Sequence, residues 1–339
     1  MRRLSHLTLS VAVLAAALHL PMIVVAQARP GAAPSYSPPR TPWGQPDLSG
    51  IYTNRDEANT PLERPDEFKG RGASEFTAAD LDKLSRERQA TAAKIAGGIG
   101  GAETGAGPTH WYEHLKGTSS RAWMIVDPPD GKLPAMTPQA LKREAAYAAL
   151  NNARSGEGRA DSWLDRSLYD RCITRGLPGS MMPAIYGNSY EILQSPDFVA
   201  IRYEMIHETR VIPLDGRAHI GQRIHEYLGD ARGHFEGSTL VVETTNFTDK
   251  THMGYNNRYN SEKYKLVERF TPVSPTRLQW QVTIDDPDTW TRPWTFTMPL
   301  TRDDTQPVFE YGCHEGNLGL RNILSAARAE EKPAEAKKE

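Results

Sequence analysis

The sequence predicts a mainly β protein, an antiparallel up-and-down barrel or strongly curled sheet with an N-terminal cover of helices and loops. Two observations predict this fold. Between Asn188 and Leu300, apolar and polar residues alternate with period two in run after run, as in half-buried strands; one run places Leu278, Trp280 and Val282 on one face. The links between runs are short and rich in glycine, proline and aspartate, which favours hairpins between antiparallel neighbours.

The alternation divides this region into about eight or nine strands. We expect them near residues 188–194, 198–207, 209–214, 222–228, 232–236, 239–246, 263–271, 277–285 and 290–300. A meander of this length leaves two unpaired edges unless it closes or is covered, and open edges pair with other chains. Closure into a barrel is therefore the expected architecture.

The first 28 residues have the three parts of a secretory signal. Two arginines precede an apolar run from Leu7 to Val25, and Ala26-Gln27-Ala28 is a small-residue cleavage site. We expect cleavage after Ala28 and export, with the bacterial periplasm as the destination. The apolar run is interrupted by polar residues and a proline, and no later run is long enough to span a bilayer. We therefore expect no stable membrane span after cleavage.

Four segments follow the signal. Residues 29–42 are rich in proline and predict an extended linker. Residues 43–180 predict a cover of helices, loops and short strands, packed as one unit with the barrel region at 181–325. Within the cover, helices are expected at 77–96, 137–153 and 162–174. Residues 326–339 are charged and low in complexity, which predicts a disordered tail.

The charge balance argues against nucleic acid as a partner. The chain has 40 basic and 42 acidic residues, and signal cleavage removes two arginines, so the net charge is near −4 and provides no basic field. The cysteines are Cys172 and Cys313. An even count in an oxidising compartment predicts a disulfide between them, with two buried free thiols as the alternative.

Several phrases resemble those of a large group of uncharacterised secreted bacterial proteins. They are TPWGQPDLSGIY, IVDPPDGKLPAMTPQA, DRCITRGLPG, RVIPLDGRAH, GHFEGSTLVVETTNF, LVERFTPV and YGCHEGNLGLRNIL. The resemblance covers nearly the whole chain after the signal and implies secretion, but it supplies no activity. The β pattern also resembles lipocalin and fatty-acid-binding barrels. That likeness concerns the fold alone, and function does not follow from it.

The main candidate site is a group of titratable residues in the β region. His207 continues the apolar face of the strand that starts near Phe198, so we expect it to point into the barrel as a general base. We expect Glu243 to orient it, and Arg210 or Arg217 to stabilise a developing oxyanion. His219 belongs to the same expected group. The alternative is that these residues only make hydrogen bonds that hold the barrel ends.

Cys313-His314-Glu315 is the second candidate. If Cys313 is bridged, His314 and Glu315 are held on a rigid segment and become candidate catalytic residues, with Glu315 as a second possible orienting group. A thiolate nucleophile at Cys313 would require a free thiol. The histidines at 207, 219, 225 and 314 show no metal-ligand spacing, so we expect neither a metal nor another cofactor.

Aromatic residues are candidates for substrate binding. Trp280, Trp290 and Trp294 lie on neighbouring strands, either as core or as walls of a pocket. Tyr203 and His225 are expected to line the same pocket.

The segment from His110 to His114 matches the H-x-x-E-H pattern of zinc peptidases. Glycines flank it and leave little room for the helix that such a site requires. We therefore expect Trp111 and Tyr112 to contribute aromatic contacts, as part of a lid over a pocket.

Together these residues predict a protein that handles a small organic molecule in a barrel pocket. Acid–base hydrolysis or elimination is the first hypothesis. A non-catalytic ligand carrier is the second, and a structural or interaction protein of the envelope is the third. The sequence does not specify the substrate or the oligomeric state.

Overall fold

The computed structural model describes residues 36–98, 112–152, 160–251, 260–305 and 307–336. The predicted signal at residues 1–28, the start of the linker and Trp111 lie outside the described residues. A compact unit begins at Tyr36.

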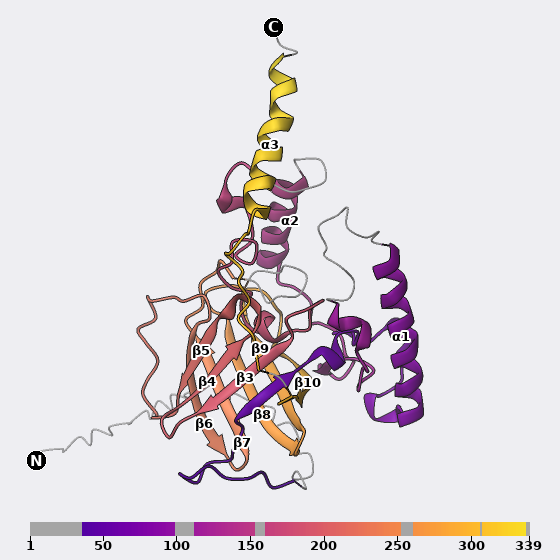
Figure 1. The fold of residues 1–339 in the computed structure, drawn as a ribbon, viewed down its shortest axis with the longest axis vertical. Coiled ribbons are helices and arrows are strands. Elements are labelled where there is room, and N and C mark those ends of the chain that lie inside the picture. Colours follow the sequence, from indigo (N-terminus) through magenta and orange to yellow (C-terminus); the bar gives the residue numbers. More distant parts are fainter. Residues whose placement is uncertain (1–35, 99–111, 153–159, 252–259, 306, 337–339) are drawn as a thin grey trace, which may run out of the picture. The chain divides into compact units, whose positions relative to one another are not determined.

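The predicted fold class is confirmed. Nine strands form one antiparallel, nearly closed, barrel-like sheet in the described chain, in the order β5-β4-β3-β1-β10-β9-β8-β7-β6 (Figure 1). Their bounds are β1 Gly50–Thr53, β3 Ser189–Gln194, β4 Phe198–Tyr203, β5 Thr209–Pro213, β6 Asp230–Glu236, β7 Thr239–Thr245, β8 Lys265–Ser274, β9 Arg277–Asp285 and β10 Trp294–Arg302. A short strand, β2 (Ile125–Asp127), pairs with β10 outside this order. β1 pairs with both β3 and β10, so it joins the two ends of the meander.

The seam between β5 and β6 is where the barrel fails to close by backbone hydrogen bonds. Nine strands that alternate in direction leave the first and the last, β5 and β6, running the same way. Consecutive parallel strands need a long return connection, and residues 214–229 provide it. Side chains fill the seam: a Cβ atom on Gly233 of β6 would lie 2.8 Å from Cγ2 of Ile212. The seam is therefore closed by packing.

The two ends of the barrel differ in character. At the hairpin end, the chain turns between β6 and β7 and between β8 and β9. At the opposite end, called here the His219 end, β4 and β7 finish and β5, β6 and β8 begin. Most of the predicted titratable residues lie near the His219 end.

The interior of the barrel is packed with apolar side chains. Trp280, Phe270 and Phe296 are each at most 1% exposed, and they contact one another with centroid separations of 5.4 and 6.4 Å. Trp290 and Trp294 are also buried and stack edge to face. These aromatic residues are core, and burial of each contributes about 1.5–3 kcal/mol. Their rings pack against one another inside the barrel.

Two predicted strands differ from the structure. The strand expected at 198–207 stops at Tyr203, because a 3-10 turn at Met205–His207 follows with positive φ at Ile206 (65°) and His207 (48°). The strand expected at 222–228 is part of the return connection and makes one isolated bridge, between Glu226 and Phe247.

The helical segments are partly as predicted. α1 (Ala78–Gly98) begins after Thr77, whose hydroxyl accepts the Asp80 N–H, and α2 (Pro138–Asn152) starts at the expected proline. The helix expected at 162–174 was wrong; only Trp163–Asp165 forms a 3-10 turn, and Cys172 has a φ of 55°. α3 (Gly319–Ala336) occupies most of the segment expected to be a disordered tail.

The predicted disulfide between Cys172 and Cys313 is confirmed. It joins residues 141 positions apart, with Cα atoms 5.7 Å apart. The bridge attaches the segment after β10 to the cover, and it is compatible with an extracellular location. Within the described residues, no helix combines the length and the apolar run that a bilayer crossing requires.

Candidate functional site

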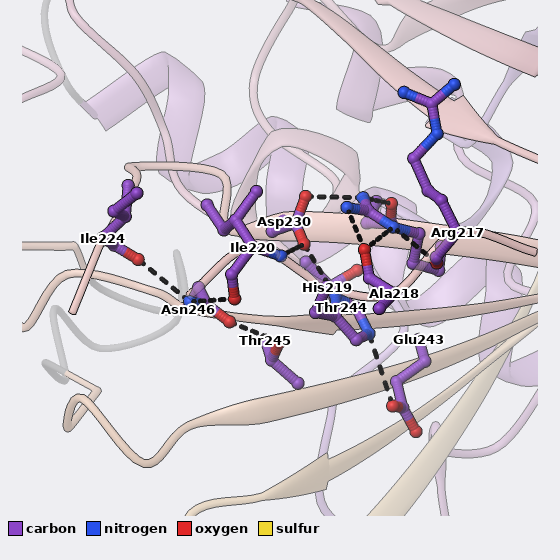
Figure 2. A network of polar contacts seen from close by, with 12 residues as sticks. Arg217, Ala218, His219, Ile220, Ile224, Asp230, Glu243, Thr244, Thr245 and Asn246 are labelled. Atoms are coloured by element: carbon purple, nitrogen blue, oxygen red, sulfur yellow. Dashed lines mark hydrogen bonds and ion pairs between the residues drawn. The ribbon is translucent and has the colours of Figure 1, made fainter. Parts of the chain in front are cut away.

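His219 is the centre of a polar network at the start of β6 (Figure 2). Its Nδ1 atom lies 2.8 Å from Oδ2 of Asp230, the first residue of β6. Its Nε2 atom lies 3.5 Å from Oε1 of Glu243 on β7. Figure 2 shows the imidazole held between the two carboxylates. The return connection supplies the histidine, and the sheet supplies both acids.

Asp230 is held in place by further donors. The same Oδ2 atom accepts the backbone N–H of Ile220 at 2.9 Å, and Oδ1 accepts Nη1 of Arg232 at 2.5 Å. Burial raises the pKa of Asp230, but the hydrogen bonds from Ile220, His219 and Arg232 outweigh it, so the pKa lies below its usual value. Asp230 is therefore a fixed, ionised partner for the imidazole.

Glu243 lies on the outer face of β7. Leu240, Val242 and Thr244 occupy the inner face, so the expectation that Glu243 points into the barrel was wrong. Burial raises the pKa of Glu243. Its ion pair with Lys265 and its contact with His219 lower the pKa by more than burial raises it, so the pKa lies below its usual value. Glu243 is ionised and half-exposed beside the imidazole.

Asn246 holds the return connection against the sheet. Its Nδ2 donates to the carbonyl oxygens of Ile224, at 2.9 Å, and Gly221, at 3.1 Å. The residue has a φ of 59°, a left-handed conformation that asparagine adopts more readily than most residues. The loop around His219 is therefore fixed at both sides, by Asp230 and by Asn246 (Figure 2).

This geometry suits a general acid or base. A carboxylate on Nδ1 favours the tautomer that carries its proton there, so Nε2, beside Glu243, is the nitrogen that can exchange a proton. The His219 side chain is 25% exposed. The two carboxylates would stabilise the imidazolium that forms.

His207 does not lie in the barrel. The turn after β4 carries it out to solvent, where its Nδ1 atom lies 2.9 Å from the carbonyl oxygen of Tyr311. The expected pairing of His207 with Glu243 is therefore wrong, since Glu243 contacts His219. His314 is exposed, with its ring 6.3 Å from that of His207, and Glu315 is exposed beside it. The disulfide-held segment thus brings His207 and His314 together without a buried acid between them.

Arg210 lies inside the barrel, where it belongs to a buried polar network. Its Nη1 atom lies 2.5 Å from Oε2 of Glu268 on β8, and its Nη2 donates to Thr244 at 2.6 Å. The Nε1–H of Trp280 donates to the same glutamate at 3.1 Å, and Tyr203 is buried nearby. This buried network links β5 to β7 and β8 across the seam, so Arg210 does not lie at a site open to substrate.

The remaining predicted residues are dispersed. Arg217 is exposed and pairs with Asp215 two residues away. His225 lies 3.5 Å from Glu262 on the surface of the His219 end. Tyr112 is buried as part of the cover.

Glu113, the acid of the H-x-x-E-H pattern, accepts a hydrogen bond from Asn188 at 2.8 Å. It has a structural role there, because that bond joins the cover to the start of β3. His110 and Trp111 lie outside the described residues.

Four side chains of the network were not predicted, and Asn246 is one of them. Asp230 and Arg232 share the sequence Asp-Ala-Arg at the start of β6, and Lys265 begins β8. The polar residues at the start of β6 were visible in the sequence as a possible part of a site. Their contact with His219 was not, because it depends on the path of residues 214–229. Among the described residues, no group of three or more histidine, cysteine, aspartate or glutamate side chains is arranged to hold a metal ion.

Comparison of the chain with protein-family models, curated proteins and solved structures finds no match.

Proposed function

We propose that this protein carries out general acid–base chemistry, hydrolysis or elimination, on a small organic molecule at His219. The observation that carries the proposal is the contact of His219 with Asp230 at Nδ1 and its closeness to Glu243 at Nε2. The site differs from the pocket expected from the sequence, because it lies on the outside of the barrel. The packed interior favours this placement.

The proposed reaction begins with Nε2 of His219 accepting a proton. The proton comes from water in a hydrolysis, or from a carbon or hydroxyl group of the substrate in an elimination. Asp230 stabilises the imidazolium through Nδ1–H, and Lys265 keeps Glu243 ionised beside it. The imidazolium then returns its proton to the leaving group.

The proposal includes secretion, with the bacterial periplasm as the location. The signal-like first 28 residues and the Cys172–Cys313 bridge support it. A ligand-binding protein without turnover is the second candidate. It is favoured by the cavity at the hairpin end of the barrel, described below.

Turnover of a panel of chromogenic esters, lactones and glycosides tests the proposal. We expect wild-type protein to hydrolyse at least one class, and His219→Gln to lower kcat/KM by about 100-fold or more, because general acid–base catalysis contributes roughly that much. His234→Gln is the matched control. His234 is an exposed histidine on the same strand, β6, that also contacts a glutamate, Glu236 at 3.2 Å, but near the hairpin end.

The expected result is a loss confined to the His219 variant, with both variants keeping the wild-type unfolding temperature. Equal rates for wild-type protein and His219→Gln across the panel would contradict the proposal.

A further inference from the structure

A cavity of about 240 Å³ lies at the hairpin end of the barrel. Tyr52, Leu278 and Arg302 form its floor; they continue the inward-facing rows of β1, β9 and β10. Pro272 and Pro275 form one wall, from the β8–β9 hairpin. The cavity is thus the mouth of the barrel, below the packed aromatic core.

The segment before β1 forms the opposite wall. Tyr36, Pro38 and Pro39 line the cavity, and the carbonyl oxygen of Pro39 accepts the N–H of Asp47 at 2.8 Å. A further bridge, between Arg40 and Pro46, folds this segment back on itself. Proline and tyrosine on both sides create a rigid apolar slot, since proline side chains lose little entropy when a ligand is bound.

Two guanidiniums, those of Arg277 and Arg302, and one carboxylate, that of Asp47, line the cavity. Arg302 pairs with Asp304, and Asp47 accepts the N–H of Ser49 at 2.9 Å. Arg277, which also lines the cavity, makes no hydrogen bond or ion pair with any described residue. Its guanidinium is exposed, forms no ion pair with a described residue and can donate two parallel hydrogen bonds to a carboxylate.

Tyr52 adds a neutral polar group at the floor. Burial raises its pKa to about 12, so its hydroxyl keeps its proton at physiological pH. The volume is below the roughly 300–1,000 Å³ of pockets for drug-sized ligands, so the ligand must be small.

We propose that this mouth binds a small monocarboxylate that carries an apolar ring or short chain. The carboxylate pairs with Arg277, and the apolar part packs between Pro39, Pro272 and Leu278. The ligand is limited to one carboxylate, because Arg277 is the lining guanidinium without an ion pair to a described residue and the Asp47 carboxylate would repel a second negative charge. The site lies at the opposite end of the barrel from His219 and does not depend on the chemistry proposed there.

Fluorine NMR with 4-fluorobenzoate tests the proposal on the full-length mature protein. We expect saturable binding, with the neutral isostere 4-fluorobenzamide at least tenfold weaker. Arg277→Gln should weaken 4-fluorobenzoate binding by roughly tenfold or more, because a hydrogen bond to a charged group is lost. Arg223→Gln is the matched control. Arg223 is an exposed arginine on the return connection that also makes no hydrogen bond or ion pair with a described residue.

Three results would overturn the proposal: no saturable binding to the wild type, equal affinity for the benzoate and the benzamide, or equal affinity in wild type and Arg277→Gln. Because Arg277 is exposed and unpaired, the variant should keep the wild-type unfolding temperature. His219→Gln should bind 4-fluorobenzoate as the wild type does, so failure of the acid–base proposal is distinguishable from failure of this one.

Discussion

At the scale of single residues, Glu208 has the most unusual titration among the described carboxyls near the barrel. It follows His207 and accepts a hydrogen bond from Thr174 Oγ1 at 2.8 Å. Burial raises its pKa to about 7, against smaller lowering effects of Thr174 and of the charge on His207. An unfolded glutamate has a pKa of about 4.3. The folded protein therefore binds this proton more tightly than the unfolded chain does.

The sign of the pH dependence follows. The protonated Glu208 carboxyl stabilises the folded state fully below about pH 4.3, and this contribution is lost as the pH rises to about 7. We predict that Glu208→Gln is more stable than the wild type at pH 8, by at most about 4 kcal/mol, and that the difference disappears near pH 4. Urea unfolding between pH 4 and 8 measures it.

The control for this prediction is Glu310→Gln, which changes an exposed carboxyl on the segment after β10. Its difference from the wild type should not vary with pH in the same way. A pH-independent difference for Glu208→Gln would mean that the carboxyl is not held protonated by the fold.

At the scale of elements, the seam between β5 and β6 decides where the site forms. Because these strands are parallel, residues 214–229 must return along the barrel, and the return brings His219 to the start of β6. The seam is closed by Gly233 against Ile212 and by the buried pair Arg210–Glu268. The parallel arrangement of β5 and β6 thus explains both the position of His219 and the way in which the barrel is closed.

Gly233→Ala tests the seam. The added Cβ would lie 2.8 Å from Cγ2 of Ile212 and 2.9 Å from Cδ2 of Leu214, so the side chains in the seam must shift to make room. Overpacking costs about 1–3 kcal/mol, while replacing glycine returns about 0.4–1 kcal/mol through the unfolded state. We expect a net loss of about 1 kcal/mol in chemical unfolding.

Gly221→Ala, on the return connection, is the matched control. Nothing lies within 4 Å of its added Cβ, and its φ is not positive, so it should be neutral or slightly stabilising. If the two alanine variants were equally stable, the close packing of β5 on β6 would be refuted.

At the scale of the whole molecule, the sequence predicts the architecture better than the site. Alternation and turn residues place seven strands near their observed positions, because a period of two is a local signal. These strands are β3, β5, β6, β7, β8, β9 and β10. The pairing of β1 between β3 and β10 has no such signal. Four residues, Gly50–Thr53, read only as a short strand of the cover.

The positions of His207 and His219 could not be predicted from the sequence, for two physical reasons. First, Ile206 and His207 adopt left-handed φ, so β4 ends before His207. His207 therefore does not continue the inward-facing residues of that strand. The contact of His219 with Asp230 depends on the parallel seam, which is a property of the strand count and not of any short segment. The disulfide was predictable because the chain has two cysteines.

The measurement that tests the central claim most directly is the kinetics of Asp230→Asn on a substrate whose turnover depends on His219. Asparagine keeps the size of the side chain and can still accept the Ile220 N–H, but it no longer favours the tautomer with Nδ1 protonated. The account predicts that kcat falls by about 100-fold or more, with KM and the unfolding temperature little changed. A folded Asp230→Asn protein with the wild-type kcat would contradict it.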